Sequence, residues 1–403
     1  MVRPAHRHDR PLSIFVMADH LGHPHGRVHG GTTYFVNTLP AMRDAGHHLT
    51  VVFLGPRHDA AARLEQRGID AHFLGMRKWD VRAAFACQRL LDAAWHDAVH
   101  LHSFKSHLLG RLAAHRRGMP AIVHVHDQTP MPPPLKLIQR RLGPATAALV
   151  GITEPVTEFA RRAYAVPSGR CHTVLHGLDL TPFLGTPRDV RDTLRRDLGT
   201  APAAPVIGMV GRVTAGKGQR ELLEAMPRVL ARVPDAELWI VGDGPDRQAC
   251  ERIARRLRLG PAVRFLGQRS DMPAILAAVD CVAMPSTLEE GFGFVAVEAM
   301  AAERPVIAFR TGGIAAAVRH EQTGILVPPA NMAMFVDALV RCLLDNAWRV
   351  RIGTQGRVHA STLTLERHVQ SMTRIFEQAI GARGGMSSTR GAEVHEVDDS
   401  ARV

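Results

Sequence analysis

The chain has 403 residues, 46% of them hydrophobic, which is enough for two domains that each bury a core. Its five cysteines show no paired or C-x-x-C spacing, which argues against a disulfide framework or a thiolate metal site and fits a reducing cytosol. No apolar run is long enough to span a membrane. The net charge of +12 would attract a phosphorylated substrate, an anionic lipid or nucleic acid, and it equally fits an arginine-rich composition without a partner.

Short apolar runs rich in β-formers alternate with helical patterns along nearly the whole chain. In the first half the predicted strands are 12–18, 49–55, 69–74, 98–102, 121–126 and 148–153. The segment 181–205 is rich in Pro, Arg and Asp and is typical of a linker with a short solvated helix. The strand pattern then restarts at 206–211, 237–242, 263–267, 281–285, 305–309 and 325–329. This alternation predicts parallel sheets covered by helices.

The repeated pattern predicts an α/β protein of two Rossmann-like, doubly wound lobes that face a central cleft. We place the first lobe at 1–185, a linker at 186–204 and the second lobe at 205–364. A C-terminal helix near 365–383 is expected to pack back on the first lobe. The tail 384–403 lacks apolar periodicity and is expected to be disordered.

The stretch VGRVTAGKGQ, residues 210–219, directly follows a predicted strand. Gly211, Gly216 and Lys217 copy most of a nucleotide-binding P-loop, but Gly218 stands where a Mg²⁺-binding Ser or Thr is required. What remains is a flexible turn into a helix N-terminus beside two cations, Lys217 and Arg212. Such a site suits phosphate, although an ordinary strand-to-helix turn with two solvated cations gives the same pattern.

The stretch EEGFGFVAVEAM, residues 289–300, places two carboxylates around a Gly-Phe-Gly turn. Gly291 and Gly293 fall at the start of a predicted helix, where backbone N–H groups are available to a ligand. Glu290 lies in the loop and Glu298 lies more than one turn into the helix, so both can face one cleft. Carboxylates suit hydroxyl groups better than phosphate. Together with the preceding turn they indicate a nucleotide sugar, unless both merely cap the loop and helix.

These motifs resemble the retaining GT-B glycosyltransferases of family four, also called group 1. GRVTAGKG is similar to the family's G-R-L-x-x-x-K-G, and Glu290 to Glu298 matches its E-x7-E. The resemblance covers residues 13–376 and is strongest over 206–330. Further counterparts occur in the family order at VGDGPDR (241–247), LAAVDCVAMPS (276–286) and TGG (311–313).

The resemblance implies a role for each site residue. Arg212 and Lys217 would hold the donor diphosphate, Glu298 the ribose hydroxyls and Glu290 a hydroxyl of the donor sugar. Backbone N–H groups would complete the contacts at Gly291, Phe292, Gly293 and Phe294. Such enzymes use no catalytic metal and no cofactor, the nucleoside-diphosphate sugar being a co-substrate, which agrees with Gly218 at the P-loop metal position.

In the first half the matching features are residues 29–52 and AIVHVHD, residues 121–127. Gly30 and Gly31 precede a helix and would let backbone approach the donor phosphate or the acceptor, or form a plain turn. His126 ends a strand, where open α/β sheets place ligands, and the family has a histidine there near the donor sugar. Strand alternation puts His100 with His102, and His124 with His126, on shared faces; with further histidines at 20, 23, 25 and 29 they could bind Zn²⁺, but we predict no metal.

Three further features bear on partners and stability. The helix pattern PPPLKLIQRRLG, residues 132–143, predicts a core-facing helix with a charged outer face, and leaves open peripheral contact with an anionic membrane. His176 stands where the family often has Asn. Glu303 stands where a helix-ending Gly is common, which predicts a left-handed residue costing about 1 kcal/mol.

We therefore predict a metal-independent hexosyl- or glycosyltransferase, cytoplasmic and with peripheral membrane contact left open. Its partners would be a nucleotide-sugar donor and a saccharide or lipid-linked acceptor of envelope or exopolysaccharide synthesis. A nucleotide-sugar epimerase on the same architecture is one alternative. A non-catalytic protein that binds nucleotide sugar or nucleic acid is another, although nucleic acid is not expected because aromatic residues are only 5%.

Overall fold

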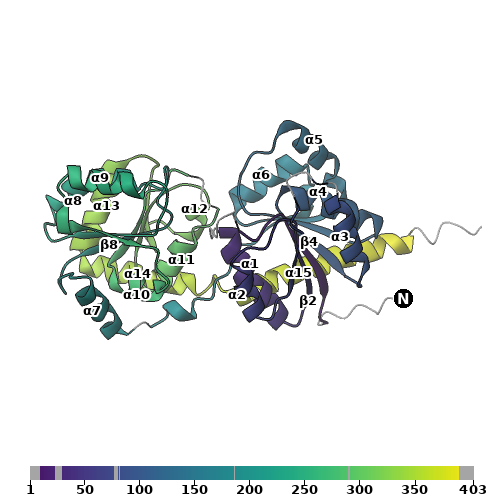
Figure 1. Cartoon of the computed structure of the whole chain (residues 1–403), viewed down its shortest axis with the longest axis horizontal. Helices are drawn as coiled ribbons and strands as arrows, with labels where there is room; N and C mark the ends of the chain where they lie inside the picture. Colours follow the sequence, from purple (N-terminus) through teal and green to yellow (C-terminus); the bar gives the residue numbers. More distant parts are fainter. Residues whose placement is uncertain are drawn as a thin grey trace, which may run out of the picture. The chain divides into compact units, whose positions relative to one another are not determined.

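The computed structural model describes residues 10–22, 30–76, 80, 82–185, 187–288 and 291–389. The chain forms two compact units, each with one parallel sheet between helices (Figure 1). Unit 1 is drawn from Met1–Gly151, Thr157–Val174 and His368–Val403, and unit 2 from Ile152–Val156 and Leu175–Arg367. This is the predicted α/β class with two Rossmann-like lobes.

The sheet of unit 1 has the strand order β3-β2-β1-β4-β5-β6-β7, with every pair parallel. Its central strands are buried almost throughout because helices cover both faces. The elements are β1 Ser13–Ala18, α1 Gly30–Asp44, β2 His48–Phe53, α2 Ala61–Gln66, β3 Ala71–Phe73, α3 Arg82–Asp92, β4 Ala98–His102, α4 Phe104–Arg116, β5 Ala121–Val125, α5 Pro133–Arg141, β6 Thr146–Gly151, α6 Glu154–Tyr164 and β7 Cys171–Thr173.

The sheet of unit 2 is also parallel and has the order β10-β9-β8-β11-β12-β13. In its hydrophobic core, alternate residues of these strands pack against apolar residues of the helices α8, α9, α13 and α14. The elements are α7 Arg188–Asp197, β8 Val206–Val210, α8 Gln219–Leu230, β9 Glu237–Val241, α9 Arg247–Arg256, β10 Val263–Gly267, α10 Met272–Ala278, β11 Cys281–Met284, α11 Phe294–Ala301, β12 Val306–Phe309, α12 Ile314–Ala317, β13 Gly324–Val327, α13 Met332–Leu344 and α14 Asn346–Ala360.

Every strand expected from the apolar runs is present, which confirms the sequence pattern. The edge strand β7 was not expected from the sequence, where Cys171–Thr173 form no apolar run. The segment expected to be a linker is instead part of unit 2. Its helix α7 is fastened by Arg195, which is 1% exposed and donates to the Asp280 carboxylate at 2.9 Å. Asp280 also accepts the Val206 N–H at 2.8 Å, so a buried ion pair joins α7 to β8.

The last helix, α15, spans Leu365–Thr389 and supplies apolar residues to the core of unit 1. Met372 and Phe376 are fully buried there beside residues of β1 and β2. The helix runs on through 384–389, which we expected to be disordered, while 390–403 lie outside the described residues.

Helix α5 differs from the core-facing helix that the sequence predicted. Leu135 and Gln139, four residues apart, are buried, whereas Leu137 and Ile138 are 52% and 44% exposed. Helical geometry explains the exposure of Leu137, since a residue two positions from Leu135 points to another side of the helix. The two exposed apolar side chains lie beside the exposed basic residue Arg141.

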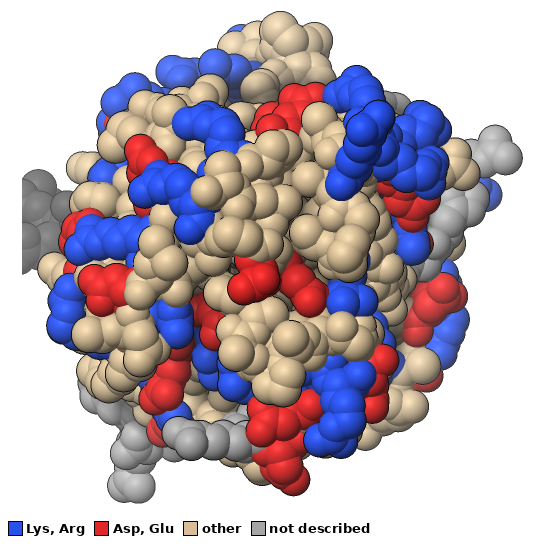
Figure 2. Space-filling view, turned by 90° about the vertical axis from the view of Figure 1, so that its left-hand side faces the viewer, with Lys and Arg blue, Asp and Glu red and all other residues tan. Residues whose placement is uncertain are grey.

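Figure 2 shows the face of the molecule that carries α7 and α8, where basic and acidic side chains interleave. The net charge of +12 is therefore not gathered into a single patch on this face. Among the described residues, no helix is long and apolar enough to cross a membrane.

Glu303 has a φ of +60°, which confirms the predicted left-handed residue after α11. Its carboxylate pairs with Arg357 at 3.1 Å, but both side chains are exposed and such pairs contribute little. The conformation therefore costs stability that this surface ion pair does not offset.

We predict that Glu303→Gly raises the free energy of unfolding by about 0.5–1 kcal/mol, because glycine adopts positive φ without a clash at Cβ. Denaturant unfolding measures the change. Glu303→Ala is the matched control, since it removes the same ion pair but keeps a Cβ. It should not raise the free energy of unfolding. Equal shifts in the two variants would contradict the explanation.

Candidate functional site

The centre of the unit 2 sheet is a topological switch point. Strands β8 and β11 are neighbours, but the chain leaves β8 toward β9 on one side and leaves β11 toward β12 on the other. In open α/β sheets a crevice forms at the carboxyl ends of two such strands, and ligands bind there. Both motifs singled out from the sequence follow these two strands, so the fold brings them together.

The first loop, 211–218, runs from β8 into α8 and depends on glycine conformations. Gly216 and Gly218 have φ of +82° and +92°. The loop is held to the helix by Gln219, whose Nε2 donates to the Arg212 carbonyl at 2.9 Å. The turn thus ends directly at the N-terminus of α8, as the sequence predicted.

The second loop follows β11 and lies against the first. The Thr287 N–H donates to the Gly216 carbonyl at 2.8 Å. A Cβ at position 218 would lie 2.2 Å from the Pro285 carbonyl oxygen, so no side chain fits there. Backbone packing therefore requires Gly218 at the position where a P-loop carries its Ser or Thr.

Two basic side chains flank this junction. Arg212 is exposed and Lys217 is half-buried. Among the described residues, no carboxylate forms an ion pair with the Arg212 guanidinium. Together with the positive end of the α8 dipole, these cations make the junction attractive to an anion.

A third loop supports the turn before α11. Gly293, in the left-handed region with φ of +84°, precedes the helix, and Thr311 Oγ1 donates to the Ser286 carbonyl at 3.0 Å. A Cβ on Gly313 would lie 1.9 Å from the Gly291 carbonyl oxygen. The glycines at 291–293 and 311–313 thus let three loops meet at one edge of the sheet.

An aromatic cluster anchors the same turn. The His176 ring stacks on Phe294 at 5.3 Å with an interplanar angle of 9°, and Phe292 meets His176 edge-on at 5.5 Å. His176 is 2% exposed. In the sequence, His176 stood out only as a departure from the family pattern. Its contact with Phe294 could not be predicted, because the two residues lie far apart in the chain and leave no local signal.

Glu298 lies within α11 and is largely shielded from water. Loss of hydration raises the pKa of its carboxyl from 4.5 to about 7. Near neutral pH this group can therefore both donate and accept a hydrogen bond, which suits sugar hydroxyls. Glu290, predicted to act with it, lies outside the described residues.

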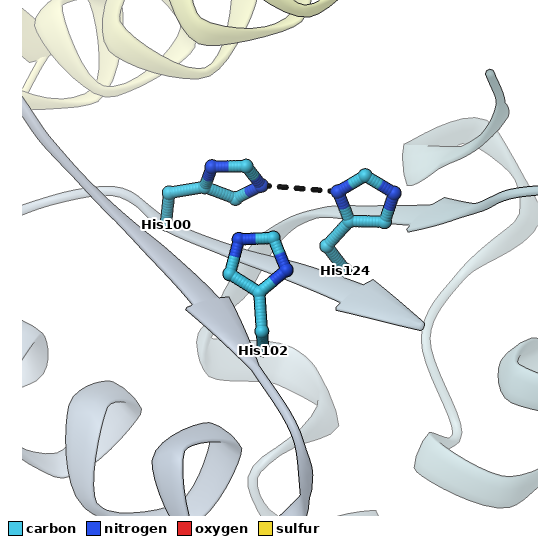
Figure 3. Close-up of side chains that lie close together, drawn as sticks. All are labelled: His100, His102 and His124. Carbon is cyan, nitrogen blue, oxygen red and sulfur yellow. Dashed lines mark hydrogen bonds between the residues drawn. The ribbon is translucent and has the colours of Figure 1, made fainter. Parts of the chain in front are cut away.

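The residues predicted in the first half lie in unit 1. Gly30 and Gly31 open helix α1, and His126 follows the last residue of β5. His102 Nδ1 lies 2.7 Å from His126 Nε2. The predicted shared face is confirmed, since the rings of His102, His124 and His126 all contact the Tyr34 ring. Figure 3 shows His100 and His102 beside His124. The histidines at 23, 25 and 29 lie outside the described residues.

Two family models match the chain, "Glycosyltransferase Family 4" over residues 28–181 and "Glycosyl transferases group 1" over residues 204–345. The D-inositol 3-phosphate glycosyltransferase of Jonesia denitrificans is 30% identical over 345 residues, which cover 80% of this chain and 81% of the relative.

Solved structures show the same fold. Anabaena HepE in complex with UDP has a TM-score of 0.80 at 21% identity, covering 90% of this chain and 99% of that chain. The UDP-glucose complex of HepE has a TM-score of 0.73 at 22% identity, covering 94% and 100%. The protein is thus a glycosyltransferase of the GT-B class. It belongs to glycosyltransferase family 4, the group 1 glycosyl transferases.

We predict that Glu298→Gln stabilises unit 2 at pH 8 and much less at pH 5. The folded pKa is raised, so burial of the ionised carboxylate costs stability above pH 7, and this cost fades as pH falls toward 4.5. A rise from 4.5 to about 7 corresponds to roughly 3 kcal/mol. Denaturant unfolding at the two pH values measures it. Asp235→Asn, at an exposed carboxylate, should show no such difference. A pH-independent effect of Glu298→Gln would contradict the prediction.

Proposed function

We propose that this glycosyltransferase moves a sugar from a nucleoside-diphosphate sugar to an acceptor hydroxyl with retention of anomeric configuration. One observation carries the proposal: the loops after β8 and β11 meet backbone to backbone at the switch point. Their contact brings the N-terminus of α8, beside Arg212 and Lys217, next to the turn before α11, the helix that carries the shielded Glu298 carboxyl. A phosphate group suits the α8 N-terminus, and sugar hydroxyl groups suit the Glu298 carboxyl. The HepE complexes with UDP and UDP-glucose support a donor of this type.

Each residue has a distinct part in the proposed reaction. Arg212, Lys217 and the N-terminus of α8 stabilise the diphosphate as it leaves and gains charge. Glu298 binds ribose hydroxyls, and N–H groups at Gly291, Phe292, Gly293 and Phe294 bind the sugar and phosphate. Glu290 binds a hydroxyl of the donor sugar. A donor phosphate oxygen, as the family resemblance implies, takes the acceptor's proton, so neither metal nor cofactor is required.

The proposed acceptor is a saccharide or a lipid-linked saccharide. The exposed Leu137 and Ile138 beside the exposed Lys136 and Arg141 would suit peripheral contact with an anionic bilayer. The name of the Jonesia relative points instead to an inositol phosphate. Product formation with each acceptor class, with and without vesicles containing phosphatidylglycerol, separates these acceptors. Vesicle sedimentation of a Leu137→Ser, Ile138→Ser variant tests the membrane contact.

We predict that Arg212→Ala and Lys217→Ala each lower kcat at least about tenfold without unfolding the protein, because their contact with the diphosphate strengthens in the transition state. Steady-state kinetics and melting curves check this. Arg228→Ala is the control: it removes an exposed arginine from the last turn of α8, the helix that follows this loop, and should leave kcat unchanged. Wild-type kcat in both site variants would remove the phosphate assignment.

We further predict that a panel of nucleotide sugars contains a donor whose sugar is transferred with unchanged anomeric configuration in EDTA. Proton NMR of the product reports the anomer, and nucleotide release reports the rate. An epimerase would instead convert the donor without any acceptor, and a binding protein would raise its melting temperature with donor but release no nucleotide. Activity that EDTA abolishes and Mg²⁺ restores would overturn metal independence.

A further inference from the structure

Both polar groups of the peptide unit between Arg212 and Val213 are hydrogen-bonded. The Val213 N–H donates to the Asp243 carbonyl at 3.0 Å, and the Arg212 carbonyl accepts from Gln219 Nε2 at 2.9 Å. Within the part of the chain that the structure describes, Gln219 is the only donor to this carbonyl. Because a peptide unit is planar, one that is held at both its N–H and its C=O cannot rotate without breaking a bond.

The backbone on the two sides of Arg212 is restrained differently. Val213 is fully buried in the core of unit 2, and its carbonyl accepts from the Asp246 N–H at 3.2 Å. Gly211 has a φ of +144°, donates its N–H to the Val241 carbonyl at 2.9 Å and has no side chain to pack. The direction in which the exposed Arg212 side chain leaves the loop therefore depends strongly on the bond to its own carbonyl.

Gln219 is well placed to supply this bond. It is the first residue of α8, is 3% exposed and reaches back seven residues along the chain to the loop. A carbonyl only accepts hydrogen bonds, so its partner must carry a donor, which the side-chain amide of Gln does. The N-terminus of α8 is thus connected directly to the backbone of Arg212.

The other end of the same loop does not depend on a single side chain. The Gly216 carbonyl accepts from the Thr287 N–H at 2.8 Å and lies 3.3 Å from the hydroxyl oxygens of both Ser286 and Thr287. Loss of one hydroxyl there would leave the backbone bond in place. At Arg212, by contrast, removal of one side chain removes the hydrogen bond to the carbonyl.

We propose that Gln219 is a positioning residue for Arg212. It fixes the peptide unit that follows Arg212, and with it the direction of the guanidinium that flanks the α8 N-terminus. The inference rests on the proposed function in one respect, that Arg212 binds the donor diphosphate. Arg212, Gln219 and Asp243 all belong to unit 2, so the argument needs no contact between the units.

Without the donor, the Arg212 carbonyl can turn toward water, because Arg212 is exposed. The peptide unit would then rotate and carry the guanidinium away from its place. A misplacement of about 1 Å can cost about 100-fold in rate. Removal of the Gln219 bond should therefore lower kcat although Gln219 itself touches no substrate.

Two variants of Gln219 separate the length of the side chain from its donor. Gln219→Met keeps the length but has no donor, and Gln219→Asn keeps the amide but places its nitrogen one bond closer to Cβ. With the donor found in the nucleotide-sugar panel, both should lower kcat about three- to tenfold, and neither more than Arg212→Ala does. Wild-type kcat in both variants would overturn the inference.

A double-mutant cycle tests whether Gln219 acts through Arg212. In an Arg212→Ala background, Gln219→Met should change kcat by less than about twofold, because no guanidinium remains to be misplaced. The same loss in both backgrounds would show that Gln219 acts on another group and would overturn the inference.

Val229→Ala is the control for a general loss of stability. It truncates a fully buried residue of the same helix, far along the chain from the loop. It should lower the melting temperature while kcat stays within about twofold of the wild type. A kcat loss in Val229→Ala equal to that in Gln219→Met would show a merely structural role for Gln219.

A measurement independent of activity completes the design. Hydrogen exchange followed by NMR should show faster exchange of the Val213 amide in Gln219→Met, relative to the amides of β9, and a wild-type rate in Arg212→Ala. An unchanged rate in Gln219→Met would overturn the positioning role. If instead Arg212→Ala keeps wild-type kcat while the exchange rates behave as expected, the place of Arg212 in the proposed function fails and the positioning by Gln219 stands.

Discussion

The close approach of two loops at the centre of the unit 2 sheet is the constraint on which the candidate site depends. The backbones after β8 and β11 come near enough for a direct hydrogen bond, and a Cβ at Gly218 would collide with the Pro285 carbonyl. A residue without a side chain is thus required for packing. The same contact aligns two helix N-termini toward one edge, which makes that edge suitable for an anionic ligand.

The loop after β8 carries an exposed charged side chain, whereas the loop after β11 leads to a carboxyl that is shielded from water. Arg212 is exposed, so its guanidinium can attract an anionic ligand through water before binding. Glu298 is shielded, and the raised pKa of its carboxyl reflects the missing hydration. A ligand that supplies hydroxyl donors would replace that hydration and favour the ionised form. Binding of such a ligand near neutral pH would thereby be coupled to release of a proton.

In unit 1, a buried histidine that stays neutral makes hydrogen bonds to two other elements. The tautomer of His107 follows from its partners, because the His124 carbonyl can only accept and so requires a proton on His107 Nε2. His107 Nδ1 then accepts from the Tyr164 hydroxyl at 2.6 Å. Desolvation lowers the pKa of His107 to about 3, so this arrangement persists across physiological pH. The buried His107 therefore acts as a fixed donor and acceptor.

The sequence by itself determined the elements and the motifs. Parallel strands buried on both faces are mostly apolar, and glycine is favoured where φ is positive, so strands and glycine turns left local signals, and Glu303 stood out at a position where glycine is common. Which residues meet was decided only by tertiary structure. The attachment of α7 through Arg195 and Asp280, the stacking of His176 on Phe294 and the bond between His102 and His126 join residues far apart in the chain. Such contacts depend on strand order and on which helix face is buried, and neither is encoded in the local spacing of residues.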